Sequence, residues 1–228
     1  MGTSSSFRSP DSPRWNVLNR ALDNQLPLER LRATLFLAGE AEWRDALRAP
    51  ALATFAETLI EAHGALEERL VRADNPSAVI AAVLGEARSA LFEHAYSPAL
   101  PVAERALRFV LVQAVQQPVP LADATSEQAA TAWQHNRGEP SDLFRRYVAA
   151  VFGQWSAHVL ARDTARLCGP GTDRSAADVR QFTEEVSNHI AELAGSVTAD
   201  LPVSDLGSHW SDVVSTVFDH GRRLERRQ

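Results

Sequence analysis

The sequence of 228 residues contains no lysine and a single cysteine. All 23 basic residues are therefore arginine, against 29 acidic residues, and the net charge is −6. The lone cysteine, Cys168, excludes an intramolecular disulfide, which is consistent with a reducing compartment. Because nucleic-acid binders usually carry a basic excess or a basic stripe, the acidic balance leads us to expect no nucleic-acid partner.

The sequence also lacks long apolar runs. None approaches the roughly 18–20 consecutive apolar residues that a membrane-spanning helix needs, and the first residues contain no apolar segment of the signal-peptide type. We therefore expect a cytoplasmic protein with no membrane partner. Apolar residues still make up 45% of the chain, which is enough for a substantial core.

Apolar residues recur every three or four positions along most of the chain, and no stretch alternates convincingly at period two. This spacing predicts an all-α fold, an irregular bundle of about eight or nine helices. The run 109–112 is apolar on all sides and predicts a buried central helix, whereas Ser141 resembles a helix N-cap. The apolar stripes cover residues 17–22, 28–37, 52–70, 80–91, 106–115, 144–159, 179–197 and 206–218.

The chain divides into a short tail and a helical domain. Residues 1–13 contain six serines or threonines and two prolines, and they offer too little apolar surface to offset the cost of ordering. We expect a flexible tail over 1–13 and a helical domain over 14–228. The proline-rich stretch Gln117-Pro118-Val119-Pro120 predicts a sub-boundary near 117–125.

The helical domain shows no motif for catalysis or metal binding. No two of its seven histidines are spaced i,i+4, and no HExxH motif or Cys/His cluster occurs, so we expect no metal site. Cys168 precedes Gly169-Pro170-Gly171 at a predicted helix end, where the helix dipole raises a thiol pKa, and this favours a structural cysteine. We expect no cofactor and no enzymatic activity, although catalytic residues assembled only in three dimensions remain an alternative.

Arginines gather at the C-terminal end of the last predicted helix. A favourable interaction with the helix dipole accounts for most of this cluster, and docking to an acidic partner or RNA is the alternative. Its members are Arg222, Arg223, Arg226 and Arg227.

The tail begins Met1-Gly2-Thr3-Ser4-Ser5-Ser6. Glycine at position 2 permits removal of the initiator methionine, and in the absence of lysine the amine of Gly2 would then be the only primary amine of the chain. The same residues match the short M-G-x-x-x-[ST] pattern of N-myristoylation. The tail lacks a polybasic second anchor, and the alanine- and arginine-rich composition is typical of a GC-rich bacterial genome, where this acylation is not expected.

This hydroxyl-rich start, followed by a proline-containing leader and Trp15, resembles the start of QatB proteins of the Qat anti-phage defence system. The resemblance covers about 15 of the 228 residues. It implies a partner related to QueC, an ATP-dependent enzyme that activates a 7-deazapurine carboxylate and transfers it to an amine, beside other proteins of the defence locus. Gly2 would be the modification acceptor, and Thr3, Ser4, Ser5 and Ser6 would be recognised by the partner enzyme.

Two functional hypotheses follow. In the first, the chain is a non-enzymatic defence component that serves as substrate and partner of the QueC-like enzyme. In the alternative, it is a helical adaptor or scaffold protein whose disordered N-terminus is inert.

Overall fold

The computed structural model describes residues 40–91, 97, 99–116, 123–167, 175–198 and 206–225. Eight α-helices and no strand occupy these residues, which confirms the predicted all-α fold. The tail over 1–13, the expected helix over 28–37 and residues 117–122 of the expected sub-boundary lie outside the described residues. The helices are α3 (Glu40–Leu47), α4 (Pro50–Arg72), α5 (Pro76–Ser89), α6 (Leu100–Val115), α7 (Ser126–Asn136), α8 (Pro140–Leu167), α9 (Ala176–Val197) and α10 (Leu206–Glu225).

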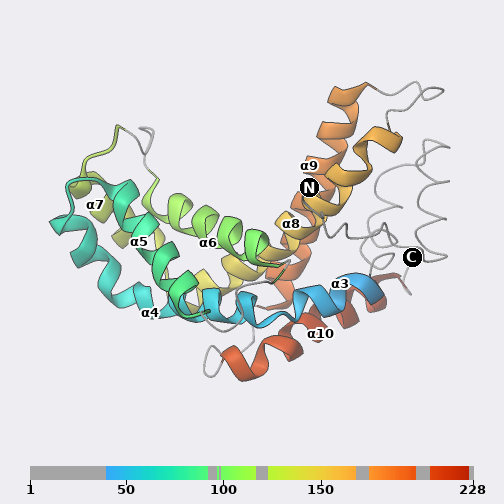
Figure 1. Ribbon diagram of the computed structural model, residues 1–228, viewed down its shortest axis with the longest axis horizontal. Helices are drawn as coiled ribbons and strands as arrows, with labels where there is room; N and C mark the ends of the chain where they lie inside the picture. Colours follow the sequence, from blue (N-terminus) through green and yellow to red (C-terminus); the bar gives the residue numbers. More distant parts are fainter. Residues whose placement is uncertain are drawn as a thin grey trace, which may run out of the picture.

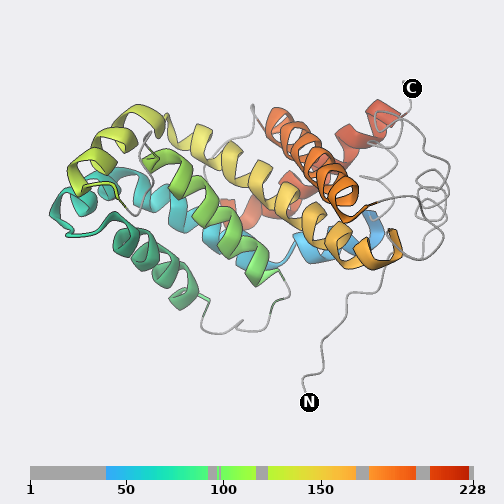
Figure 2. The ribbon, with the colours of Figure 1, turned by 90° about the horizontal axis from the view of Figure 1, so that it is seen from above.

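The helices form two limbs that are joined by α8 (Figure 1). The first limb contains α4, α5, α6 and α7, and the second contains α9 with the C-terminal half of α8. Seen from above, α8 runs from the end of α7 to the far end of the second limb (Figure 2). It contacts α4 and α6 in one limb and α9 in the other, while α3 and α10 pack together along the base.

Local sequence signals explain where several helices begin. Pro50, Pro76 and Pro101 each occupy a first-turn position, where the missing N–H has no helical partner to lose. The side chain of Asn75 accepts a 2.8 Å hydrogen bond from the backbone N–H of Ser77. Capping boxes open two further helices, with the pairs Thr125/Gln128 at α7 and Ser175/Asp178 at α9.

The structure corrects the expected start of α8. The helix begins at Pro140, so Ser141 lies inside it and is not the N-cap. Instead, the carboxylate of Asp142 accepts a 3.0 Å hydrogen bond from the backbone N–H of Glu139. Gly138 precedes this turn with a φ of 63°, a backbone conformation that favours glycine.

The expectation that residues 109–112 are buried throughout is wrong in part. Val110 and Leu111 are fully buried, but Phe109 is 46% exposed and Val112 is half-buried. The run is helical, as predicted, and a helix in contact with neighbours on one side directs part of any four-residue run outward.

The corner between α3 and α4 is held by buried side chains from two other helices. The indole Nε1 of Trp210 in α10 donates a 2.6 Å hydrogen bond to the carbonyl of Leu47, the last residue of α3. The hydroxyl of Tyr147 in α8 donates a 3.0 Å hydrogen bond to the carbonyl of Leu52 in α4. The rings of Tyr147 and Trp210 lie 6.0 Å apart, so these contacts join α8 and α10 to the same corner.

Small residues allow α8 and α9 to pack closely. A Cβ atom on the buried Gly153 of α8 would lie 3.1 Å from the Cβ of Ala191 and 3.3 Å from the carbonyl oxygen of Ser187. The second contact is with backbone, which cannot turn away as a flexible side chain can. Gly153 therefore sets how near the two helices approach at this point.

Replacing Tyr147 with Phe should lower the free energy of unfolding at neutral pH by about 1 kcal/mol, because the hydrogen bond to Leu52 is lost. Burial raises the pKa of Tyr147 well above its ordinary value of 10.0. The folded protein therefore keeps this phenol neutral, and the corresponding stability is present below pH 10 and lost as the pH rises further. Urea unfolding at a series of pH values should show the gap between wild type and variant narrowing above pH 10. A gap that stays constant would contradict this account.

Replacing Gly153 with Ala should destabilise the protein by about 1–3 kcal/mol, since the added methyl group overpacks the contact between α8 and α9. Gly64 in α4 provides the matched control, because a Cβ atom there meets nothing within 4 Å. Gly64→Ala should raise stability by about 0.5–1 kcal/mol through helix propensity alone. Thermal and urea unfolding of both variants test the pair, and equal effects of the same sign would refute the overpacking argument.

Candidate binding pocket between α8 and α9

A pocket of about 400 Å³ opens between α8 and α9. Both helices contribute long polar side chains and small apolar residues to its lining. The α8 residues are Arg145, Arg146 and Ala149, and the α9 residues are Asn188, Ala191, Glu192 and Gly195.

The small residues create the floor of this pocket. A Cβ atom on Gly195 would lie 3.4 Å from the Cβ of Ala149 and 3.9 Å from the Cγ of Arg145, which are ordinary contact distances. The helices are therefore close together here, and Gly195 leaves open the space that a larger side chain would fill. This floor lies two turns along α9 from Ser187, whose carbonyl oxygen is near Gly153.

Opposite charges line the pocket without neutralising each other. Arg145 forms an ion pair with Asp142 on its own helix, and Arg146 donates a 2.7 Å hydrogen bond to the carbonyl of Asn136. Within the described part of the chain, Glu192 forms no ion pair with either arginine. Two arginines and an exposed glutamate thus border the pocket, and the described partners of the arginines, Asp142 and Asn136, are not among its lining residues.

Two buried polar atoms near the pocket have no hydrogen-bond partner among the described residues. One is the Nε of Arg145, which lines the pocket. The other is the Oγ of Ser187, a residue that is only 8% exposed and directly precedes Asn188. Unsatisfied buried polar groups cost free energy, and such atoms also occur away from the pocket, at Arg48 and Trp133, so they are not peculiar to this region.

Several sequence candidates fall outside the described residues, so the structure does not test them. These are the modification acceptor, the recognition segment, the lone cysteine and the end of the arginine cluster, namely Gly2, Thr3, Ser4, Ser5, Ser6, Cys168, Arg226 and Arg227. Of the cluster's described members, Arg222 forms ion pairs with Glu40 and Asp219, and Arg223 is exposed. Arg222 therefore helps to attach α10 to α3.

His63 of α4 lies against α7 and the turn that follows it. Its Nε2 is 3.0 Å from the carbonyl oxygen of Gly138, and its ring centroid is 6.2 Å from that of Trp133. Among the described residues, no group of three or more His, Cys, Asp or Glu side chains is placed to hold a metal ion. None of the described helices combines the length and apolar character that crossing a membrane requires.

The pocket was not predicted from the sequence, although a signal for its floor is present. Small residues recur at four-residue intervals on both helices, at Ala149 and Gly153 in α8 and at Ser187, Ala191 and Gly195 in α9. Such spacing places them on one face of each helix and permits close packing. The sequence alone does not reveal that these two faces meet, nor which charged residues border them.

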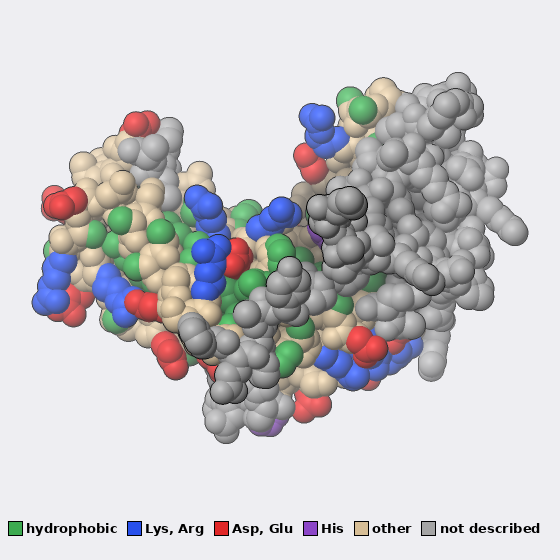
Figure 3. Space-filling model, viewed as in Figure 1, with side chains coloured by type: hydrophobic (Ala, Val, Ile, Leu, Met, Phe, Trp, Pro, Cys, Tyr) green, Lys and Arg blue, Asp and Glu red, His purple; other side chains and the backbone are tan. Residues whose placement is uncertain are grey.

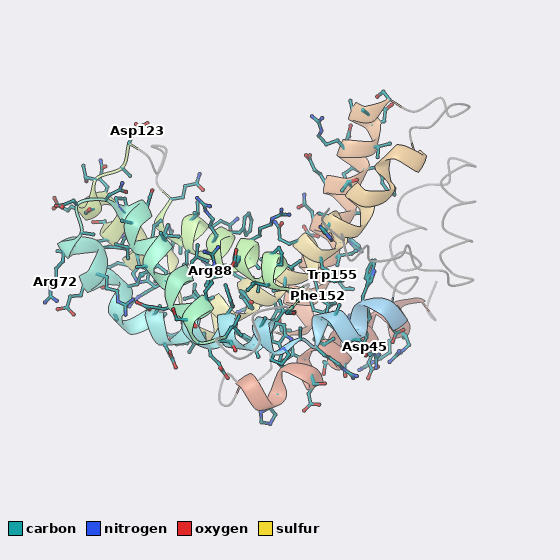
Figure 4. The ribbon with its side chains drawn as sticks, in the orientation of Figure 1. Asp45, Arg72, Arg88, Asp123, Phe152 and Trp155 are labelled. Atoms are coloured by element: carbon teal, nitrogen blue, oxygen red, sulfur yellow. The ribbon has the colours of Figure 1, made fainter. Side chains whose placement is uncertain are left out.

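A second surface feature lies on the outer face of α6. Phe109 is 46% exposed and has Arg105 and Arg108 as exposed neighbours on the same helix. Neither arginine forms an ion pair within the described residues, whereas Arg88 of α5 binds Glu104 of α6 at 2.8 Å. Figure 3 shows a hollow between the two limbs with arginine side chains beside it, and Figure 4 places Arg88 next to α6.

Comparisons with protein-family models, curated proteins and solved structures gave no match to this chain.

Replacing Arg145 with Met should change the free energy of unfolding by less than about 1 kcal/mol. The ion pair with Asp142 is partly exposed, with side-chain exposures of 40% and 36%, and such pairs contribute little. Methionine keeps an unbranched apolar stem and removes the unsatisfied Nε. Urea unfolding measures the change, and a loss of more than about 2 kcal/mol would show that Arg145 is needed for the fold rather than available for a ligand.

Proposed function

We propose that this chain is a non-enzymatic, cytoplasmic component of a QatB-like anti-phage defence system. Its partner would be a QueC-like ATP-dependent enzyme that attaches a 7-deazapurine to Gly2, beside other proteins of the same defence locus. The observation that carries the proposal is the start Met1-Gly2-Thr3-Ser4-Ser5-Ser6 in a sequence without lysine. In a mature chain that begins at Gly2, an amine-directed enzyme has a single primary amine to modify.

The chemistry of the α-amine supports this choice of acceptor. Its ordinary pKa of about 7.7–8.0 leaves roughly a third of it neutral and nucleophilic near pH 7.5, whereas arginine side chains remain protonated. The Gly2 nitrogen attacks the activated carboxyl carbon of the deazapurine, the activating group leaves, and the nitrogen loses one proton. The product is an amide at the N-terminus.

The proposal gives the rest of the tail a binding role. Glycine carries no side chain that would obstruct the reacting nitrogen. Residues Thr3 to Ser6 offer backbone groups and four hydroxyls, which can hydrogen-bond within the active-site entrance of the partner enzyme. A tail of 13 residues can extend about 40 Å, so the helical domain could stay outside that active site.

Intact-mass spectrometry of the chain co-expressed with the QueC-like enzyme tests the proposal. The protein should gain the mass of the 7-deazapurine carboxylic acid less one water, and fragmentation should locate that mass on Gly2. Gly2→Pro should abolish the gain, because proline presents a hindered secondary amine. Ser12→Ala, a change in the same tail away from the acceptor, should leave the gain intact.

An added mass that persists in Gly2→Pro, or that maps outside the first peptide, would refute acylation of Gly2. An unmodified protein recovered beside an active partner enzyme would do so as well. The distinction from N-myristoylation is direct, since a fatty acyl group adds a different mass.

The second candidate function is that of a helical adaptor, and the outer face of α6 favours it. Phe109 is partly exposed beside Arg105 and Arg108, and neither arginine has a carboxylate partner among the described residues. Aromatic and arginine side chains are enriched where proteins bind one another. Deleting residues 2–12 separates the two candidates, because an adaptor would keep its partner and its cellular phenotype, whereas a Gly2 substrate would lose its function.

A further inference from the structure

We propose that the pocket between α8 and α9 binds a small zwitterion. Arg145 and Arg146 would hold its oxyanion, and Glu192 would hold its amino group. This inference concerns the helical domain alone and does not depend on modification of Gly2.

The charges of the pocket select for a dipolar ligand. Two guanidinium groups favour a carboxylate or phosphate, and arginine binds such groups with paired N–H donors. A ligand that is only anionic would also meet the carboxylate of Glu192, and one that is only cationic would meet both arginines. A molecule with both charges places each opposite its complement.

The structure leaves hydrogen-bonding capacity in the pocket for such a ligand. A guanidinium group has five N–H donors, and the only described partner of Arg145 is Asp142. That ion pair uses one N–H of Nη2 and positions the Arg145 side chain, and because Nε is buried, the donors left for a ligand are on Nη1 and the second N–H of Nη2. Glu192 has no ion-pair partner among the described residues, so its carboxylate can accept hydrogen bonds from an ammonium group.

The size and floor of the pocket limit the ligand further. Its volume of about 400 Å³ is near the lower end of the range for small-molecule sites, roughly 300–1,000 Å³. Ala149, Ala191 and Gly195 form an apolar floor that suits a short aliphatic side chain of the ligand. Asn188 adds an amide that can both donate and accept a hydrogen bond. Free amino acids are the simplest molecules with these properties.

Binding of the twenty common α-amino acids to the full-length protein tests the proposal. Saturation-transfer NMR would identify those that bind, and titration of the strongest would give its Kd. Arg145→Met and Glu192→Gln should each weaken that binding about tenfold or more, because each removes one charged partner. Gly195→Leu should abolish binding, because the larger side chain fills the space above the floor of the pocket. This variant tests the site without changing any charge.

Matched controls come from α9 itself. Arg180 and Glu184 are exposed charged residues of this helix that do not line the pocket. Arg180→Met and Glu184→Gln should change the Kd by less than about twofold, since exposed charges outside the site are screened. Melting temperatures of all five variants would show whether each protein is folded under the binding conditions.

Three results would overturn the proposal. The first is that no amino acid binds at up to about 10 mM, and the second is that Arg145→Met and Glu192→Gln bind as tightly as wild type. The third is that acetate binds as tightly as the best amino acid and binds more tightly to Glu192→Gln. That pattern would indicate an anion site in which Glu192 is only repulsive.

Discussion

The close packing of α8 and α9 is the contact on which the second limb depends. Among the described helices, α9 packs chiefly against α8 and makes a smaller contact with α10. Gly153 permits the approach because any side chain there would meet Ala191 and the backbone of Ser187. The same approach brings Arg145 and Arg146 near α9, and so it produces the pocket. Stability of the limb and shape of the pocket therefore have one cause, the absence of bulky side chains along this face.

The arginine-only basic composition affects how the helices are tied together. Arg88 links α5 to α6 through Glu104, and Arg222 links α10 to α3 through Glu40. Arginine suits such links because its planar fork can bind a carboxylate through two N–H groups. Most of these pairs are partly exposed, so they contribute little stability. Arginines without a carboxylate partner in the described part of the chain, such as Arg105 and Arg108, are thus better evidence of binding surfaces than the paired ones.

The all-α fold was predictable because the spacing of apolar residues along the sequence is a local signal of helices. The predicted stripe over 52–70 lies within α4, and the stripe over 179–197 lies within α9. The helix α7 was missed although its capping box, Thr125 with Gln128, is visible in the sequence, because its short alanine-rich stretch gives a weak apolar stripe. The partly exposed Phe109 was wrongly expected to be buried, because the hydrophobicity of a short run does not show which side of the helix packs against a neighbour. Neither the pairing of α8 with α9 nor their pocket follows from local patterns, because both depend on contacts distant in sequence.

The tail and the pocket place different demands on the chain. Acylation of Gly2 requires only that a flexible segment reach a foreign active site, and no residue of the helical domain has to take part in the chemistry. A ligand site, in contrast, requires side chains held at fixed positions. Asp142 holds Arg145 through an ion pair, and the carbonyl of Asn136 accepts a hydrogen bond from Arg146. A substitution where α8 and α9 pack together can therefore alter the pocket without changing the Gly2 amine. The proposed acylation and the proposed ligand site are therefore independent, and either one can be refuted without affecting the other.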